Sequence, residues 1–306
     1  MYNIPILFLI FCRPDTTEQV FEQIRAIKPA RLYVAADAPR AGRPDEAERA
    51  AQARAITEKV DWPCEVKTLY REQNLGCKRA VSEAISWFFE QEEYGVILED
   101  DCLPHPSFFP YCEELLLRYK DDQRIGHISG NCFLPQAISP ELSYDFCSVT
   151  HIWGWATWRR VWKNFSLDFP FWEATKNNPD KRKSLFRTKR EEIYFTSFIE
   201  DTLADRYGIS AWDVQYYFML RTQNQLSIYP SVNLVTNIGL NSVGATHATR
   251  KKEKQFVSSQ PIALPLTHPV YVMDNKDINE AAVKGSFFSY KRDRKSTRLN
   301  SSHRCL

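Results

Sequence analysis

Four strand-length runs alternate with helix-like segments in the first half of this 306-residue chain. The runs are residues 6–11, 31–36, 64–69 and 94–98. Apolar residues at helical spacing, and a Thr16/Gln19 capping-box signal in the first case, predict helices over residues 16–27, 45–60 and 81–89, with a fourth beginning at Ser107. This β-α-β-α-β-α-β order predicts an α/β fold with an open, mainly parallel sheet and helices on both faces.

The composition is that of an ordinary globular protein, with 43% hydrophobic and 25% charged residues, enough for one large domain or two small ones. The net charge of +2 gives no reason to expect a nucleic-acid partner. Only 10 residues are glycine, and neither G-x-G-x-x-G nor G-x-x-x-x-G-K-[ST] occurs. A dinucleotide-binding fold and a P-loop are therefore disfavoured, because both need glycines where the backbone approaches phosphate.

The apolar segment 5–11 is too short to span a bilayer and lacks a basic flank, so we expect a buried strand there. The eight cysteines are scattered, with no C-x-x-C and no paired Cys/His spacing, which argues against a zinc site. With no export signal, the cysteines are expected to be reduced and the protein cytoplasmic.

Polar residues follow each of the four predicted strands. Arg13, Asp37 and Asn74 come shortly after the first three, and the acidic triplet 99–101 follows the fourth. Ligands of open parallel sheets bind beyond the carboxyl ends of the strands. The four strand ends are therefore expected to bring these residues to one crevice.

The triplet Glu99-Asp100-Asp101 directly follows the apolar run 96–98. Three carboxylates at the tip of a buried strand repel one another, and such a cluster usually needs a cation. Mg²⁺ and Mn²⁺ take oxygen ligands and leave coordination positions for substrate phosphates. The triplet therefore suggests a metal–diphosphate enzyme, with a solvated acidic loop as the alternative.

The second half of the sequence is less regular. Residues 151–158 are rich in tryptophan around Gly154, which fits either a core plug or an aromatic platform for a sugar or a base. The polar, basic segment 176–190 is interpreted as a solvated or mobile loop; a lid, or attraction to an anionic substrate or lipid surface, is the weaker alternative. The remaining expected elements are a strand at 124–129, helices at 191–207 and 214–220, a strand at 226–235 and a loop at 237–247.

The last residues, 294–306, have no apolar pattern and match a recurrent peptide translated from sequencing-adapter DNA. We therefore interpret them as a non-native tail. The expected organisation is one domain over residues 1–250, a C-terminal extension over 251–293 that packs on it or is partly flexible, and this tail.

The stretch 96–109, Val-Ile-Leu-Glu-Asp-Asp-Cys-Leu-Pro-His-Pro-Ser-Phe-Phe, resembles the nucleotide-sugar glycosyltransferases of the GT-A fold, and most of all the N-acetylglucosaminyltransferase I-like group. A first strand ending near Arg13 and a second ending near Asp37 support this. The resemblance covers roughly residues 4–250, with weaker matches at Gly154-Trp155, Trp212-Asp213 and 242–247, and residues 160–207 have no clear counterpart.

The resemblance implies a role for each matched residue. Asp101 would ligate Mn²⁺ or Mg²⁺, and His247 would touch the metal or the diphosphate unless it is structural. The donor nucleotide sugar would be bound by the remaining predicted residues: Arg13 and Asp37 at the nucleotide (Asp37 at a uracil edge), Glu99 and Asp100 near ribose and sugar, and Asn74, Gly154 and Trp155. Asp213 would be the catalytic base, with a helix N-cap as its alternative role and Glu200, Asp201 and Asp205 as rival bases.

The predicted function is a metal-dependent, inverting transfer of a sugar from a nucleoside diphosphate, expected to be UDP, to a hydroxyl of a glycan or lipid-linked acceptor, as in polysaccharide biosynthesis. Peripheral association with the inner face of the membrane is left open. One alternative is a sugar-nucleotidyltransferase, which should carry a Gly-rich phosphate loop after the first strand, where this chain has Cys12-Arg13-Pro14-Asp15. The other is a non-catalytic protein that binds nucleotide sugars or carbohydrates.

Overall fold

The computed structural model describes residues 1–133, 137–186, 188–204, 212–239 and 257–282. Its strands are β1 (Ile6–Ile10), β2 (Arg31–Ala36), β3 (Glu65–Tyr70), β4 (Tyr94–Glu99), β5 (Cys102–Pro104), β6 (Ile125–Ser129), β7 (Tyr144–Cys147), β8 (Trp155–Trp158), β9 (Leu226–Pro230) and β10 (Val235–Asn237). Its helices are α1 (Pro14–Ile27), α2 (Pro44–Thr57), α3 (Gly76–Gln91), α4 (Phe108–Arg118), α5 (Arg159–Trp162), α6 (Pro170–Thr175), α7 (Pro179–Leu185), α8 (Lys189–Leu203) and α9 (Asp213–Thr222).

Eight of the strands form one sheet in the order β3-β2-β1-β4-β8-β6-β9-β7. Strands β1 to β4 are parallel to one another, and β8 runs antiparallel between β4 and β6. Strands β5 and β10 pair separately as a short antiparallel ribbon. The predicted α/β fold class, with a mainly parallel central sheet flanked by helices, is confirmed.

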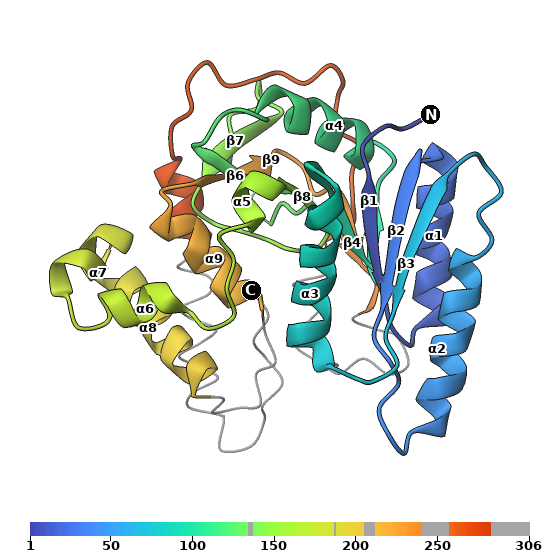
Figure 1. The fold of residues 1–306 in the computed structure, drawn as a ribbon. Coiled ribbons are helices and arrows are strands. Elements are labelled where there is room, and N and C mark those ends of the chain that lie inside the picture. The colour runs from blue at the N-terminus through green and yellow to red at the C-terminus, as the bar shows by residue number, and fades with distance from the viewer. Residues whose placement is uncertain (134–136, 187, 205–211, 240–256, 283–306) are drawn as a thin grey trace.

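Helices α1 and α2 lie side by side on one face of β1–β3, and α3 lies on the opposite face (Figure 1). Right-handed crossovers explain this arrangement, because the chain moves from β1 outward to β3 and then returns past them to β4. The inner strands are buried along their whole length; every residue of β1 is buried. Strands covered on both faces need the near-continuous apolar sequence that predicted them.

The helix predictions are right in position and differ in detail. Helix α1 begins at Pro14, two residues before the predicted start, and its N-cap is Arg13. The predicted capping box is therefore wrong: the Thr16 hydroxyl instead donates to the Arg13 carbonyl oxygen, 3.2 Å away. Proline at the first position explains the earlier start, because its fixed φ suits a helix and its missing N–H is not needed there.

The basic segment 176–190 is not the loop that was predicted. It contains α7, whose first turn is capped by the Asn178 side-chain oxygen accepting from the N–H groups of Asp180 and Lys181. No residue of α7 is buried, so the expected solvation is correct for this helix, whereas Phe186 directly after it is buried in a core cluster. The predicted strand 226–235 is divided into β9 and β10.

The aromatic second half packs as two clusters. Trp155, Trp162 and Trp212 belong to the main core under the sheet. A separate cluster joins α6, α8 and α9 and surrounds an ion pair between Arg221 and Glu191, both buried. Residues 257–282 cross this half of the molecule (Figure 1) and bury Ile262 in the main core.

Candidate functional site

The sheet order places the predicted polar residues at one edge. Because β3, β2, β1 and β4 are adjacent and parallel, their carboxyl ends meet there, followed by Asn74, Asp37, Arg13 and the triplet 99–101. Within this edge the side chains form two groups. Arg13 contacts Asp100 and Asp101 at the ends of β1 and β4, whereas Asp37 contacts Asn74 at the ends of β2 and β3.

Arg13 is the cation of the acidic triplet. Its Nη1 pairs with Asp101 Oδ2 and lies 3.5 Å from Asp100 Oδ1. Asp100 also accepts a hydrogen bond from the Phe11 N–H at 2.9 Å, which ties the end of β4 to the end of β1. Asp100 and Asp101 are buried, and Glu99 is half-buried. The triplet is therefore not a solvated acidic loop.

Burial and mutual repulsion dominate the charge state of this group. Burial raises the pKa of Glu99, and the charges of Asp101 and Asp100 raise it further. Burial likewise raises the pKa of Asp100, although Arg13 opposes the shift. Burial alone would lower the pKa of Arg13, but Asp101 and Asp100 more than offset it, so the pKa is raised. Among the described residues, Arg13 is the cation paired with the triplet, and one guanidinium does not balance three carboxylates, which favours a further cation.

Asp37 and Asn74 build the first turn of α3. The Asp37 carboxylate accepts from the backbone N–H of Leu75 and Gly76, each at 3.0 Å, and from Asn74 Nδ2 at 3.1 Å. Asn74 also donates to the Ala38 carbonyl oxygen. An aspartate at a helix N-terminus satisfies donors that have no partner within the helix. Both residues thus have a structural role in shaping the wall of the site, in addition to the predicted contact with a nucleotide.

Asp101 is enclosed by residues 237–239, the start of the predicted loop 237–247, to which the sequence assigned no contact with the triplet. The Ile238 N–H donates to the Asp101 carbonyl oxygen at 2.8 Å, and Asn237 in β10 pairs with Cys102 in β5. A Cβ atom on Gly239 would collide with the Asp101 carboxylate, so only glycine fits there. The available signal was Gly239 in the predicted loop 237–247, four residues after the predicted strand 226–235, but pairing between β5 and β10 could not be read from periodicity.

Asp213 lies at the start of α9, where Trp212 is the N-cap residue. The prediction that Asp213 could itself be the N-cap is therefore wrong; it is the first residue of the helix. It is buried, and its charge contributes to the raised pKa of Glu99 and of Cys77 in the first turn of α3. Asp213 therefore belongs to the electrostatic environment of the acidic strand end.

The platform interpretation of residues 151–158 is wrong for Trp155. Its ring is fully buried and stacks on Trp212, with centroids 5.8 Å apart. Gly154 is also buried, and its carbonyl oxygen accepts from the Gly130 N–H at 2.9 Å. Trp155 can therefore influence a ligand only by holding the start of α9, next to Asp213. Trp153 is the partly exposed tryptophan of this stretch.

Four further predicted residues remain, of which the structure describes two. Glu200 is exposed and Asp201 is buried, both on α8. His247, the second predicted metal ligand, and Asp205, a rival base, lie outside the described residues. The structure therefore brings together Arg13 and the triplet, with Asp213 in their field.

A divalent cation fits the acidic strand end when a diphosphate supplies further ligands. Among the described residues, no three His, Cys, Asp or Glu side chains are grouped to hold a metal by themselves. Asp101 offers one carboxylate, and Mg²⁺ is commonly bound through one or two carboxylates plus substrate phosphates. The shortage of positive charge at the triplet supports such a ligand set.

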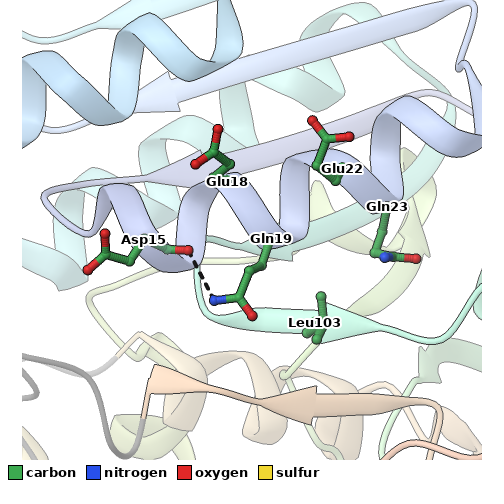
Figure 2. A pocket seen from close by; sticks show the side chains of 6 residues that line it. All are labelled: Asp15, Glu18, Gln19, Glu22, Gln23 and Leu103. Carbon is green, nitrogen blue, oxygen red and sulfur yellow. Dashed lines mark hydrogen bonds between the residues drawn. The ribbon is translucent and has the colours of Figure 1, made fainter.

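A pocket lies along helix α1 (Figure 2). It has a volume of about 320 Å³ and is lined by Asp15, Glu18, Gln19, Glu22 and Gln23 of α1 and by Leu103. Three carboxylates without a basic residue would repel a nucleoside diphosphate. This pocket is therefore not the donor site.

Within the described part of the chain, none of the helices combines the length and the apolar character needed to cross a membrane. This finding leaves the predicted cellular location and membrane association as predictions.

Neither a family model nor a curated protein matches the chain. Solved structures similar to it include an apo UDP-glucose pyrophosphorylase (TM-score 0.38, 8% identity, 77% of this chain and 93% of that one). Another is a 4-diphosphocytidyl-2C-methyl-D-erythritol synthase from Anaerococcus prevotii (TM-score 0.33, 8% identity, 65% of this chain and 85% of that one). A third is HddC from Yersinia pseudotuberculosis (TM-score 0.32, 9% identity, 53% of this chain and 80% of that one). Similarity at this level carries no argument about activity, and the resemblance to the N-acetylglucosaminyltransferase I-like group stays a prediction.

Proposed function

We propose that this protein is a metal-dependent glycosyltransferase that uses a nucleoside-diphosphate sugar. The observation that carries the proposal is the acidic strand end, where Arg13 pairs with Asp100 and Asp101 of the triplet at the carboxyl edge of a parallel sheet. Asp101 would hold Mn²⁺ or Mg²⁺, which when bound neutralises the negative charge on the diphosphate leaving group. UDP is the proposed carrier.

Asp213 is the proposed catalytic base for an inverting transfer. Its carboxylate would take the proton of an acceptor hydroxyl while that oxygen forms a bond to the anomeric carbon. The bond between the anomeric carbon and the phosphate oxygen breaks on the opposite face, and its electron pair leaves with the nucleoside diphosphate. Asp213 is buried at the start of α9, and its charge acts on Glu99 at the acidic strand end, which supports a place for it at the donor site.

A sugar-nucleotidyltransferase is the rival activity. Only residues 11–13 separate β1 from α1, and the helix begins at Pro14 directly after Arg13. This short connection leaves no glycine-rich loop to wrap a nucleoside triphosphate. The local structure after β1 therefore favours glycosyl transfer over nucleotidyl transfer.

The test is a screen of nucleotide sugars with Mn²⁺, with and without candidate glycan or lipid-linked acceptors. Glycosyl transfer predicts release of nucleoside diphosphate and a product with the inverted anomeric configuration. Incubation of the same enzyme with sugar 1-phosphates and nucleoside triphosphates should release no pyrophosphate. Pyrophosphate release in that second assay, with no nucleoside diphosphate in the first, would replace the proposal by the nucleotidyltransferase. Tight binding of nucleotide sugars with no release in either assay would favour a non-catalytic binding protein.

A further inference from the structure

Arg13 occupies one of the two carboxylate oxygens that Asp101 offers to a divalent cation. Its Nη1 pairs with Asp101 Oδ2, and the other carboxylate oxygen accepts from the Cys102 thiol at 3.5 Å. A thiol is a weak donor, whereas the guanidinium is a full positive charge. A divalent cation that takes Oδ2 of Asp101 therefore has to displace Arg13, the stronger of the two partners.

Arg13 pairs with the carboxylates through only one of its three side-chain nitrogens. Only Nη1 contacts the carboxylates; Nε and Nη2 have no hydrogen-bond partner in the part of the chain that the structure describes. The stronger bidentate pairing that guanidinium groups form with carboxylates is thus not used. The Arg13 side chain is also 23% exposed, more than either carboxylate that it contacts.

The backbone of Arg13 and the position of Asp100 are fixed independently of that side chain. The Arg13 carbonyl oxygen accepts from the Thr17 N–H at 2.9 Å and from the Thr17 hydroxyl at 2.8 Å. Asp100 is held by the Phe11 N–H. The guanidinium can therefore turn on its own side-chain torsions while the end of β1 and the start of α1 stay in place.

We propose that Arg13 is the resident counter-cation of Asp101, that a divalent cation displaces it, and that the released guanidinium binds the donor diphosphate. This inference rests on the proposed function and adds a consequence to it. A cation that binds Asp101 releases Arg13, which is then free to bind the diphosphate. A diphosphate that binds Arg13 releases Asp101, which is then free to bind the cation. Each ligand therefore strengthens binding of the other, and the coupling is reciprocal.

The test is a binding cycle with Mn²⁺ and UDP on the whole protein, using the free Mn²⁺ electron paramagnetic resonance signal and titration calorimetry. In Arg13→Gln, Mn²⁺ alone should bind about tenfold more tightly than in the unaltered protein, because no cation competes for Asp101. UDP alone should bind about tenfold more weakly. The factor by which UDP tightens Mn²⁺ binding should shrink. Arg25→Gln, which removes an exposed arginine from the same helix, should change none of these affinities.

Equal Mn²⁺ affinity in Arg13→Gln and in the unaltered protein would overturn the inference while leaving the proposed function intact. If the unaltered protein binds neither Mn²⁺ nor UDP, the proposed function itself fails. Should Arg13→Gln not fold, Arg13→Lys carries the test. Its ammonium should compete for Asp101 as the guanidinium does, so Mn²⁺ affinity stays near that of the unaltered protein while UDP binds more weakly. Unchanged UDP affinity in Arg13→Lys would contradict the transfer of Arg13 to the diphosphate.

Discussion

The two halves of the central sheet use their polar and aromatic residues in opposite ways. In the half formed by β1–β4, Arg13 and Asp37 follow the strands and stay partly accessible at the sheet edge. In the half formed by β6–β9, His127 and Trp155 lie within the strands and are fully buried. The first half thus gathers polar side chains at a partly accessible edge, whereas the second half buries His127 and Trp155 in the core. Residue type alone does not distinguish the two uses; position relative to the strand end does.

Asp213 lies in the second half and acts electrostatically on the first, and its substitution should have the largest effect. It begins α9, in the second half, and acts electrostatically on Glu99, in the first. Asp213→Asn should lower kcat by about 10²–10⁴-fold, the usual contribution of a general base, without weakening UDP binding. The measurement is steady-state kinetics on the donor and acceptor found in the screen. Glu200→Gln, an exposed change on α8, is the control and should retain activity. A similar loss in both variants would mean that Asp213 is not the base.

Substitution of Trp155 tests the role of buried aromatic rings in the half of the sheet formed by β6–β9. Its ring contacts His127, Trp162, Trp212 and Tyr216, and it has no exposed surface. Trp155→Ala should lower the free energy of unfolding by about 3–5 kcal/mol, the usual cost of deleting a buried large aromatic ring. Urea unfolding followed by circular dichroism measures this. The matched change Trp153→Ala, at the partly exposed neighbour, should cost less than about 1 kcal/mol. Equal costs would remove the distinction between the two tryptophans.

His127, in the half of the sheet formed by β6–β9, should make the free energy of unfolding depend on pH. Burial lowers its pKa to about 3, so the folded protein holds it neutral. The unfolded chain takes up a proton below its ordinary pKa of 6.5, and stability is therefore lost as the pH falls from 6.5 toward 3. In His127→Gln the loss of unfolding free energy should be smaller by about 1.4 kcal/mol per pH unit within that window. Urea titrations at about pH 6.5 and about pH 4.5 compare the two slopes, and parallel slopes would show that His127 is not the source.

Asp37 should give the smallest effect, because its role at the sheet edge is a helix cap. Removing its carboxylate leaves the N–H groups of Leu75 and Gly76 without their acceptor. Asp37→Ala should cost about 1 kcal/mol of stability, within the range for helix caps. Asp45→Ala, an exposed first-turn residue of α2, serves as the control. If Asp37→Ala abolishes UDP binding with no loss of stability, its nucleotide contact outweighs its capping role.

The regular half was predictable because its information is local. Strand-length runs, helical spacing and the order of the elements determine β1–β4 and place Arg13 and the triplet at one edge. The predictions that were wrong or missing depend on contacts between segments that are distant in the sequence. The stacking of Trp155 on Trp212 joins residues far apart in sequence, and aromatic composition is the same for a core plug and a platform. The contact of Gly239 with Asp101 likewise needs the pairing of β5 with β10.

Local signals can also mislead when a stronger one lies beside them. The sequence signal for a capping box at Thr16 was overridden by Pro14, because the fixed φ of proline favours a helix that begins there. The segment 176–190 was judged by its charge, whereas Asn178 and Pro179 supply a helix start that needs no apolar face.

The central claim is that Asp101 binds a divalent cation together with a nucleoside diphosphate. Titration calorimetry of UDP, with and without Mn²⁺, tests it most directly, on the unaltered protein and on Asp101→Asn. Mn²⁺ should tighten UDP binding to the unaltered protein by on the order of tenfold or more, and Asp101→Asn should lose that enhancement while staying folded. The same enhancement by Mn²⁺ in both proteins would contradict the account.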